Sequence, residues 1–494
     1  MTRITVCYFA ESLERLEHFR QQEIESIAEI WRIEKGYGPK ELCTFLESPA
    51  DSTIALMKFH SAALLKFVAS RAVLLHSVCE QIVIARSMNL MLRKLSKMQS
   101  VLENLGMGVG RRFKLHIHAS GFSFTAEEKR RLYEVLGLAL PHVGIVDLVT
   151  PETEFWVFFE GKRSEHDGPQ LSIQRICFTK LLYNSARQSL LARYSLKTRP
   201  HIGTTSLPPE LSFLLANIGL IRSSALVYDC FCGTGSTLVS AGHFGAICLG
   251  SDRDARTMRG RPSPKRKQTE KKYPKPRSID LAFQGPKSIV GNMDYYDLQK
   301  RSVDFMRLSV ESCKDLWRTS RGGLFDAIVT DPPYGIREGA KRVDRVKCSE
   351  MSLHRMNINT AGDQCPLSSI PFVQYSTAEL ESDLLNFAAS SLRLHGRIVF
   401  WHPTAIGVAD YFPTHPCLQL LYKSTHNINV RFSRDLLVFE KICEPSHAEK
   451  ATDQTDKWVA FMMNFKRREL PSTDPMQKDS VRDVYFATPT WRSG

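Results

Sequence analysis

A short loop of the sequence carries residue types that can bind the amino group of a nucleobase. Asp331, Pro332, Pro333 and Tyr334 follow directly after the apolar run Phe325–Thr330. Neither proline has an N–H, and the rings stiffen the backbone, so the Pro332 carbonyl can still accept a hydrogen bond. The Asp331 carboxylate and that carbonyl can each accept one hydrogen of an –NH2 group, while the Tyr334 ring stacks on the base. Taken alone, the loop could also be a plain proline turn that ends a strand.

A second motif, Val227–Thr237 (VYDCFCGTGST), indicates a loop that binds a nucleoside. Its glycines let the backbone approach a ligand closely, and the helix that follows offers unpaired N–H groups. Asp252 lies nineteen residues after Gly233, at the end of the next predicted strand, where a carboxylate can accept hydrogen bonds from both ribose hydroxyls. Leu238 stands where a dinucleotide fingerprint has its third glycine, so a ligand without a pyrophosphate is favoured.

Both motifs follow predicted strands that alternate with helical segments, which indicates a parallel, doubly wound sheet. The strands are predicted at Leu226–Asp229, Ala246–Ser251, Ser288–Val290, Phe325–Thr330, Arg397–Trp401, Leu418–Tyr422 and Arg434–Lys441. The last two are joined by a short connection, which allows an antiparallel hairpin at one edge.

The first part of the chain has the pattern of a mixed α and β region. From Arg111, apolar residues alternate with Lys114, His116 and His118, which predicts a half-buried strand with a basic outer face that can contact RNA. The other expected elements are a strand at Ile4–Phe9, helices over Leu13–Ile30 and Ser61–Val78, a helix from Thr125 and a strand at Phe155–Phe159.

The composition favours an intracellular protein that binds a polyanion. Lys and Arg total 66 against 52 Asp and Glu, a formal charge of +14, so nucleic acid is the first expected partner and an anionic membrane the second. No apolar run reaches the roughly 18 residues of a membrane-spanning helix, and the N-terminus lacks a signal-peptide core. We therefore expect a soluble, cytoplasmic protein with no membrane partner.

Cysteines and basic residues give two further expectations. The twelve cysteines include no C-x-x-C pair, so no metal site is expected. Residues 253–277 contain eleven Lys or Arg against two acidic residues. This segment is interpreted as a solvated, disordered insertion; the alternative is a flexible arm for phosphates that includes Lys265, Arg266 and Lys267.

The order of the two motifs resembles that of class I methyltransferases acting on exocyclic amines. More closely, five segments resemble the catalytic subunits of the eukaryotic tRNA (guanine-10-N2)-methyltransferase family: GTTSLPPELSFLLAN, VYDCFCGTGSTLVSAGHFGA, LGSDRDARTMRG, FDAIVTDPPYGIREGA and LLNFAASSLRLHGRIVFWHPT. This resemblance spans roughly residues 200–441. Upstream, FKLHIHASGFSFTAEEKRRL is similar to the THUMP region of the same family.

The resemblance implies a domain organisation and partners. The fold would be a Rossmann-like class I methyltransferase sheet preceded by an α+β region. The implied domains are a ferredoxin-like region at 1–60, a THUMP-like tRNA-binding domain at 61–190, a methyltransferase domain at 191–445 with a basic insertion at 253–278, and a tail at 446–494. The cofactor would be S-adenosylmethionine, the substrate tRNA, and the protein partner a small zinc-binding activator subunit.

The resemblance also implies roles for individual residues. The expected cofactor-binding residues are Asp229, Phe231, Gly233, Thr234, Gly235, Asp252, Asn292, Asp294 and Ser206. The family usually has proline at the place of Cys230 and an acid at that of Asn292, so the adenine contact is assigned either to the Asn292 amide or to Asp294. Ser206, with Thr205, is expected either to close over the methionine end of the cofactor or to cap the next helix.

In the expected mechanism, Asp331 and Pro332 accept the two hydrogens of the guanine N2 amine and Tyr334 stacks on the base. The nitrogen lone pair then points at the sulfonium methyl group, and positioning supplies most of the acceleration. The base must leave its stack to enter the site. His201, Trp401 and His402 are expected to be structural. The same is expected of Arg337 and Glu338, for which lining the base pocket is the alternative because they follow Tyr334 closely.

Two other functions compete with this one. A DNA adenine N6-methyltransferase can use the same amine-binding loop, but the basic α+β region from about residue 60 to 190 favours RNA. A non-catalytic RNA-binding relative could keep the fold, but the presence of Asp252, Asp331 and Tyr334 disfavours it.

Overall fold

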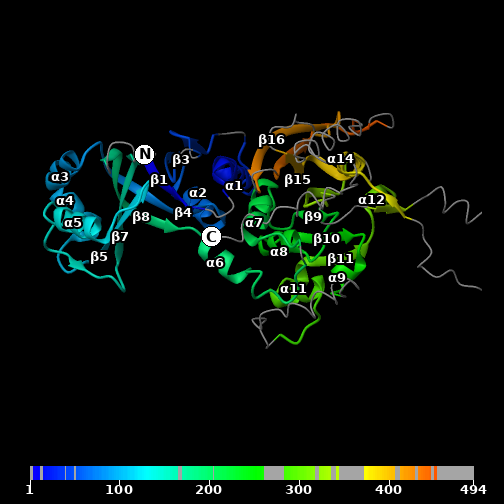
Figure 1. Ribbon diagram of the computed structural model, residues 1–494, viewed down its shortest axis with the longest axis horizontal. Helices are drawn as coiled ribbons and strands as arrows, with labels where there is room; N and C mark the ends of the chain where they lie inside the picture. The colour runs from blue at the N-terminus through cyan, green and yellow to red at the C-terminus, as the bar shows by residue number, and fades with distance from the viewer. Residues whose placement is uncertain are drawn as a thin grey trace, which may run out of the picture. The chain divides into compact units, whose positions relative to one another are not determined.

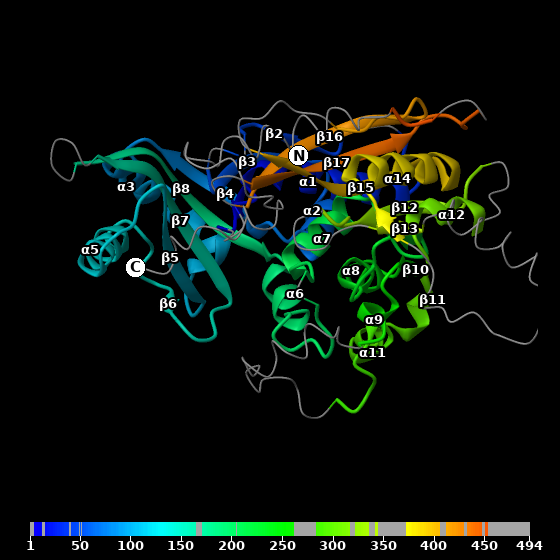
Figure 2. The same cartoon turned by 45° about the vertical axis from the view of Figure 1, so that its right-hand side comes forward.

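The computed structural model describes residues 4–11, 15–38, 41–48, 50, 52–164, 170–203, 205–260, 283–316, 322–334, 341–343, 372–405, 412–428, 432–446 and 450–452. The chain divides into two compact units, Met1–Tyr194 and Ser195–Gly494. Each unit is built around its own large β-sheet, as Figures 1 and 2 show. Within the described residues, no helix is both long enough and apolar enough to cross a membrane.

The first unit has an eight-stranded sheet in the order β2-β3-β1-β4-β8-β7-β5-β6. Its strands are β1 Ile4–Phe9, β2 Cys43–Phe45, β3 Ile54–Phe59, β4 Leu75–Ala85, β5 Arg112–Ser120, β6 Ile145–Val146, β7 Thr153–Ser164 and β8 Gln170–Asn184. Its longer helices are α1 Arg20–Glu34, α2 Ala62–Arg71, α3 Met88–Ser96, α5 Ala126–Gly137 and α6 Arg187–Arg193, with shorter turns η1 Glu17–Phe19, α4 Gln99–Leu102 and η2 Glu103–Met107.

The elements β1-α1-β2-β3-α2-β4 form a βαββαβ arrangement in which β1 lies between β3 and β4. Helices α1 and α2 cover one core of this part, which includes Cys7, Ile27 and Leu64. The long strand β8 pairs with both β4 and β7. The segment after residue 60 therefore shares a sheet with the strands before it.

The helix expected over Ser61–Val78 is half right. Ser61 caps α2 by accepting a hydrogen bond from the Leu64 backbone, but the helix ends at Arg71 and β4 begins at Leu75. Leu75, Val78 and Cys79 are all buried, on both faces of the strand. A strand that is buried on both faces lacks the strict alternation of apolar and polar residues that identifies a strand, which explains the error.

The second unit has a seven-stranded sheet in the order β11-β10-β9-β12-β15-β17-β16. Its strands are β9 Leu226–Asp229, β10 Ile247–Asp252, β11 Ser302–Arg307, β12 Phe325–Thr330, β15 Leu392–Ala405, β16 Leu418–Asn427 and β17 Phe432–Lys441, and β13 Lys341–Val343 pairs separately with β14 Phe372–Gln374. Its helices are α7 Pro209–Ile218, α8 Ser236–His243, α9 Ala255–Met258, α11 Ile289–Tyr295, α12 Val310–Leu316 and α14 Thr377–Ser391, with the turn η3 Gln299–Arg301.

The five strands from β11 to β15 are parallel, and β17 runs antiparallel to both β15 and β16. The expected parallel sheet and edge hairpin are thus confirmed. Figures 1 and 2 show α14 and α12 on one side of this sheet and α7 and α8 on the other. The chain leaves β9 in one direction for β10 and β11 and returns on its other side as β12, so the order reverses between β9 and β12.

One predicted strand is wrong. Ser288–Val290 begins helix α11, and the Ser288 hydroxyl caps it by accepting a hydrogen bond from the Gly291 backbone. The strand in this region is β11, which lies at the sheet edge. Val303 and Asp304 of β11 are exposed, so its sequence lacks the apolar run by which the inner strands were recognised.

Candidate functional site

The two motifs of the sequence meet at the carboxyl ends of neighbouring parallel strands. The glycine loop follows β9, Asp252 ends β10, and the Asp331–Tyr334 loop follows β12. Because β9 lies between β10 and β12, all three segments border the point where the strand order reverses. This is the usual position of ligand sites in open α/β sheets.

Asp229, the last residue of β9, supports the glycine loop through hydrogen bonds of its carboxylate. Its carboxylate accepts hydrogen bonds from the Phe231 backbone at 2.9 Å, from the Thr330 hydroxyl at 2.5 Å and from the Thr237 hydroxyl. Burial raises the pKa of Asp229 to about 7 although these three donors act against it. The side chain ties β9 to β12 and α8, so it supports the loop. Phe231 lies half-buried against the core of the unit.

The glycines of the loop are required by its backbone and its neighbours. Gly233 and Gly235 have φ angles of 50° and 84°, in the left-handed region that favours glycine. The Gly233 N–H donates to Asp252 Oδ2 at 2.9 Å, and the Asp254 N–H donates to Oδ1 at 2.7 Å. Asp252 therefore faces the loop, and its contact with the ribose stays a prediction. Ile289 of α11 closes the other side of Gly235.

Replacing Gly235 with alanine should disrupt the loop. A Cβ there would lie 2.7 Å from the Ile289 side chain, and φ would remain unfavourable. We expect a loss of about 1–3 kcal/mol in the free energy of unfolding, together with weaker cofactor binding. Thermal unfolding and calorimetry measure the two effects. Gly242→Ala, within α8, is the matched control because its Cβ would make ordinary contacts of 3.4 Å or more; equal effects of the two substitutions would contradict this account.

The connector before α7 is hydrogen-bonded to the glycine loop. The Ser206 hydroxyl accepts from the Gly203 backbone and lies 2.7 Å from the Thr234 hydroxyl. It does not cap α7, whose N-cap is Pro208. The buried Arg199 guanidinium donates to the Ser236 hydroxyl at 2.7 Å. Helix capping by Ser206 is therefore wrong, and closure over the methionine end of the cofactor stays a prediction; Thr205 beside it is exposed.

Asn292 has a different role from the predicted one. Its fully buried amide accepts a hydrogen bond from the His201 backbone at 2.9 Å and donates to the carbonyls of His201 and Thr234 at 2.7 and 2.9 Å. Because both amide hydrogens are bound and the side chain is inaccessible, Asn292 holds the connector on the loop and does not face the adenine. Asp294, half-buried on the same helix, stays the prediction for that contact.

His201 is part of the same connection, which agrees with its expected structural role. Its Nε2 donates to the Thr257 carbonyl at 2.6 Å, so the connector also reaches α9, directly after Asp252. Sequence reasoning found Ser206 but not Arg199. A buried arginine that binds a residue 37 positions away leaves no local pattern.

The Asp331–Tyr334 loop is held by residues from the edge hairpin. Tyr334 donates its hydroxyl hydrogen to Asp331 Oδ1 at 2.5 Å, and Arg434 Nη1 on β17 donates to the Tyr334 hydroxyl oxygen at 3.2 Å. Pro332 is buried, while Asp331 and Tyr334 are half-buried. Burial raises the pKa of Asp331, and the charge of Arg434 and the bond from Tyr334 oppose this change. Arg337 and Glu338 lie outside the described residues.

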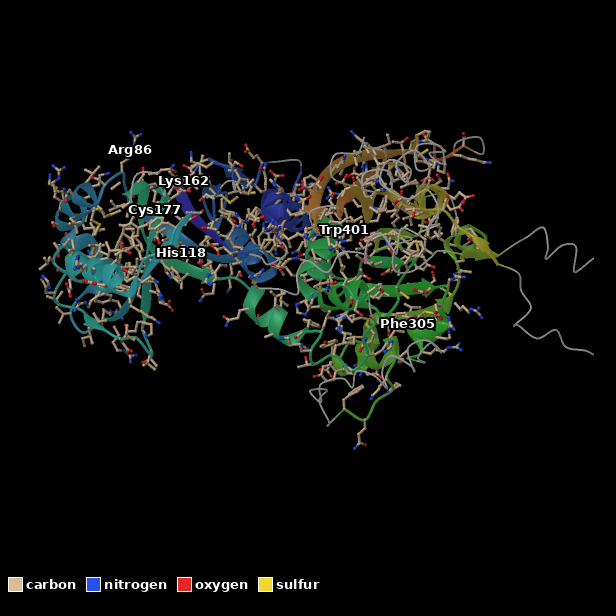
Figure 3. All side chains as sticks on the ribbon, viewed as in Figure 1. Arg86, His118, Lys162, Cys177, Phe305 and Trp401 are labelled. Carbon is tan, nitrogen blue, oxygen red and sulfur yellow. The ribbon has the colours of Figure 1, made fainter. Side chains whose placement is uncertain are left out.

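Trp401 and His402 lie behind this loop as structural residues. Figure 3 labels Trp401, which is fully buried in β15 with the Arg434 guanidinium 4.3 Å above its ring. His402 Nδ1 lies 2.8 Å from Glu381 of α14, and both side chains are buried. The sequence did not single out Arg434, because it lies 100 positions from Tyr334.

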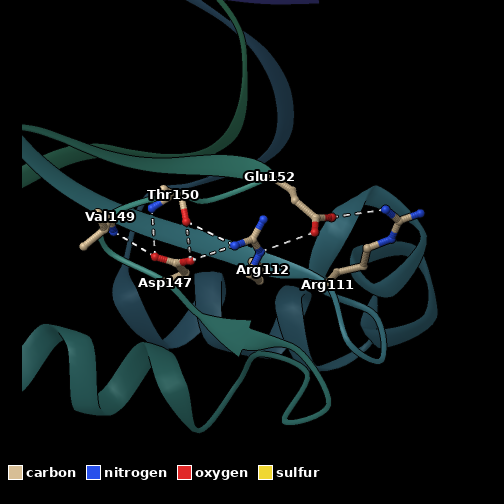
Figure 4. Close-up of polar contacts among 6 residues, drawn as sticks. All are labelled: Arg111, Arg112, Asp147, Val149, Thr150 and Glu152. Atoms are coloured by element: carbon tan, nitrogen blue, oxygen red, sulfur yellow. Dashed lines mark hydrogen bonds and ion pairs between the residues drawn. The ribbon is translucent and has the colours of Figure 1, made fainter.

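The basic face expected on β5 is partly neutralised by acidic neighbours. His116 stacks on Trp156 with ring centroids 4.2 Å apart and lies 2.7 Å from Glu154. Arg111 and Arg112, at the start of the strand, pair with Glu152 and Asp147, as Figure 4 shows. Lys114 is half-buried. RNA contacts by Lys114 and His116 stay a prediction, and Lys265, Arg266 and Lys267 lie outside the described residues.

The described part of the chain holds no group of three or more His, Cys, Asp or Glu residues that could bind a metal ion. Cys230 and Cys232 of the glycine loop are both buried and carry free thiols. Burial raises the pKa of both thiols well above the usual value. They are therefore packing residues at neutral pH.

Comparisons with known proteins identify relatives of this chain. Residues 197–356 match a family model described as "RMKL-like, methyltransferase domain". The chain is 33% identical over 336 residues to the tRNA (guanine(10)-N(2))-methyltransferase TRMT11 of Bos taurus, which covers 67% of each chain. The protein of that name from Dictyostelium discoideum is 28% identical over 505 residues, covering 97% of this chain and 88% of its own. The crystal structure of TrmN from Thermus thermophilus has a TM-score of 0.43 at 15% identity, covering 89% of this chain and 100% of its own.

Proposed function

This chain belongs to the tRNA (guanine(10)-N(2))-methyltransferase family, and we propose that it transfers a methyl group from S-adenosylmethionine to the exocyclic N2 amine of a tRNA guanine, at position 10. The observation that supports this most is that the two motifs lie together at the carboxyl ends of neighbouring parallel strands. The glycine loop with Asp252 and the Asp331–Tyr334 loop follow neighbouring parallel strands. Either motif alone occurs in proteins of many functions. Together, the glycine loop can bind a nucleoside cofactor next to the Asp331–Tyr334 loop, which can bind an amine that accepts the methyl group.

The residues of the glycine loop fit S-adenosylmethionine. Gly233 leaves the backbone open to close approach, and Asp252 offers carboxylate oxygens beside it. We assign the ribose hydroxyls of the cofactor to Asp252 and its adenine to Asp294. Its methionine end is assigned to the space beside Gly233 of the glycine loop and Ser206 of the connector. When bound, the cofactor supplies an electrophilic methyl group on a sulfonium.

The Asp331–Tyr334 loop orients the amine. The guanine N2 lone pair is delocalised into the ring, so the free amine is a poor nucleophile. Asp331 and the Pro332 carbonyl accept its two hydrogens, which directs the lone pair toward the methyl group, and Tyr334 stacks on the base. The carboxylate also stabilises the positive charge that develops on the nitrogen, and this charge-dependent effect is greatest in the transition state.

The same family membership supports two partners. We propose that the first unit, with its THUMP-like region, binds the tRNA, and that a small zinc-binding activator subunit assists the catalytic chain. Reconstituting the chain with and without such a subunit tests the second proposal, because a partner that acts as an activator will raise kcat or the thermal stability of the chain. An unchanged kcat and an unchanged thermal stability would contradict the proposed activator subunit.

The basic segment after Asp252 supports a further prediction about tRNA binding. Substituting Lys265, Arg266 and Lys267 with glutamine should weaken tRNA binding and reduce the slope of log affinity against log salt by about 1 for each tRNA phosphate that these side chains neutralise in the wild type. Cofactor affinity should not change. An unchanged slope would mean that the segment is a solvated insertion that does not bind phosphates.

The experiment that tests the function uses labelled S-adenosylmethionine with tRNA or duplex DNA as acceptor. Label is expected in tRNA, recovered as N2-methylguanosine. Label in DNA and none in tRNA would instead identify an adenine methyltransferase, and label in neither, with tRNA still bound, would identify a non-catalytic RNA-binding protein.

A further inference from the structure

We propose that Arg434 is a positioning residue for methyl transfer, which acts through Tyr334 to hold Asp331 as an oriented, ionised acceptor; the proposal rests on the function proposed above. Arg434 lies on β17, in the antiparallel hairpin that closes the sheet edge. It belongs to neither of the two sequence motifs.

Arg434 is fixed by partners on three sides. Its Nε donates to His426 Nδ1 on β16 at 3.1 Å, and its guanidinium carbon lies 4.3 Å from the centroid of the Trp401 ring on β15. Its Nη1 donates to the Tyr334 hydroxyl at 3.2 Å. The arginine is 7% exposed. A planar guanidinium that is stacked and hydrogen-bonded in this way has one defined orientation.

The hydrogen bonds run in one direction from Arg434 to Asp331. Because Arg434 can only donate, the Tyr334 oxygen accepts, and the Tyr334 hydrogen is directed to Asp331 Oδ1. This arrangement orients the carboxylate and leaves its second oxygen, Oδ2, for the amine. It also holds the hydroxyl end of Tyr334, whose ring is proposed to stack on the base.

The positive charge of Arg434 favours the ionised form of Asp331. Asp331 is half-buried, and the partial loss of water raises its pKa, which favours the protonated carboxyl that accepts hydrogen bonds less well. The charged or titratable groups that contacts connect to this part of the site include Tyr334 on the loop itself, Arg434 on β17, His426 on β16, His402 on β15, Glu381 on α14 and Asp229 on β9. Among them, Arg434 and Tyr334 lower the pKa of Asp331.

The test measures the single-turnover rate of methyl transfer to tRNA against pH, for wild type, Arg434→Met and Arg434→Lys. Arg434→Met should lower the rate at neutral pH about tenfold or more and move the acid limb of the profile to higher pH, since an Asp331 carboxylate without this cation protonates more readily. Arg434→Lys should have a rate and an acid limb between those of Arg434→Met and wild type, because lysine keeps the charge but lacks the several N–H donors of the guanidinium. Affinities for cofactor and tRNA should change less than about twofold.

Arg222→Met is the matched control. Arg222 pairs with Asp326 at the opposite end of β12, so its loss removes a partly buried arginine from the same unit without changing the loop. Its acid limb should stay at the wild-type pH. In addition, NMR titration of isotope-labelled aspartate carboxyl carbons, with Asp331→Asn to assign the signal, should show Asp331 titrating at higher pH in Arg434→Met.

Three outcomes would overturn the proposal. The first is a folded Arg434→Met variant with the wild-type acid limb, and the second is an unchanged Asp331 titration in that variant. The third is a loss confined to tRNA affinity, which would make Arg434 a phosphate contact. If wild type methylates no tRNA at any pH, the proposed function fails, but the titration still decides whether Arg434 keeps Asp331 ionised.

Discussion

Asp331→Ala is expected to lower the single-turnover rate of methyl transfer by roughly 100-fold or more while leaving cofactor and tRNA affinities nearly unchanged. The reason is that the glycine loop after β9 is proposed to hold the cofactor, whereas Asp331, after β12, is proposed to act on the reacting amine. Its side chain accepts a bond from Tyr334 and is oriented before the base arrives. Rapid-quench assays with saturating enzyme measure the rate, and calorimetry measures the affinities.

Asp331→Asn separates two contributions of this carboxylate. The amide oxygen can still accept one hydrogen bond, so a small loss would mean that Asp331 only orients the amine. A loss close to that of alanine would mean that its negative charge stabilises the positive charge on the nitrogen. Asp326→Asn, at the other end of the same strand, is the control: it should affect unfolding more than the rate, because Asp326 pairs with Arg222 and Arg393. A wild-type rate in Asp331→Ala would contradict the mechanism.

Asp252→Ala should weaken cofactor binding about tenfold or more, since charge-assisted hydrogen bonds to the ribose contribute about 1.5–3 kcal/mol. The carboxylate also accepts the Gly233 N–H at 2.9 Å, so its loss loosens the loop that binds the cofactor. At saturating cofactor the transfer rate should recover.

Asp254→Ala provides the comparison for this experiment. Asp254 lies two residues further on and pairs with Arg256, while only its backbone N–H contacts Asp252. Calorimetry should therefore give wild-type cofactor affinity for Asp254→Ala. If Asp252→Ala binds the cofactor with the wild-type affinity as well, Asp252 does not bind the ribose.

The sequence predicted the parts of this structure that are local. The strands β9 and β12 were found with their observed bounds, because each is a short apolar run that ends at a motif. The hairpin of β16 and β17 was found because two strands with a short connection can pair directly. The segment at Ser288 was misread because its capping serine and the two apolar residues after it resemble a short strand as much as a helix start.

The tertiary contacts of the site could not be predicted in this way. Asn292 binds the His201 backbone across 91 positions, so its sequence neighbours do not reveal that it is a buried clamp. Arg434 reaches Tyr334 only because β17 turns back antiparallel beside β15. The residues that contact a ligand form motifs, whereas the residues that position them are determined by packing and are spread along the chain.

The central claim is that the exocyclic amine of a tRNA guanine accepts the methyl group. The most direct measurement compares two tRNAs that differ only at the target nucleotide, guanosine or inosine, which lacks the amine. Both should bind with similar affinity, and mass spectrometry of the digested products should find N2-methylguanosine in the first and no added methyl group in the second. A methyl group at the inosine position, or on any ring atom of the guanosine, would contradict the account.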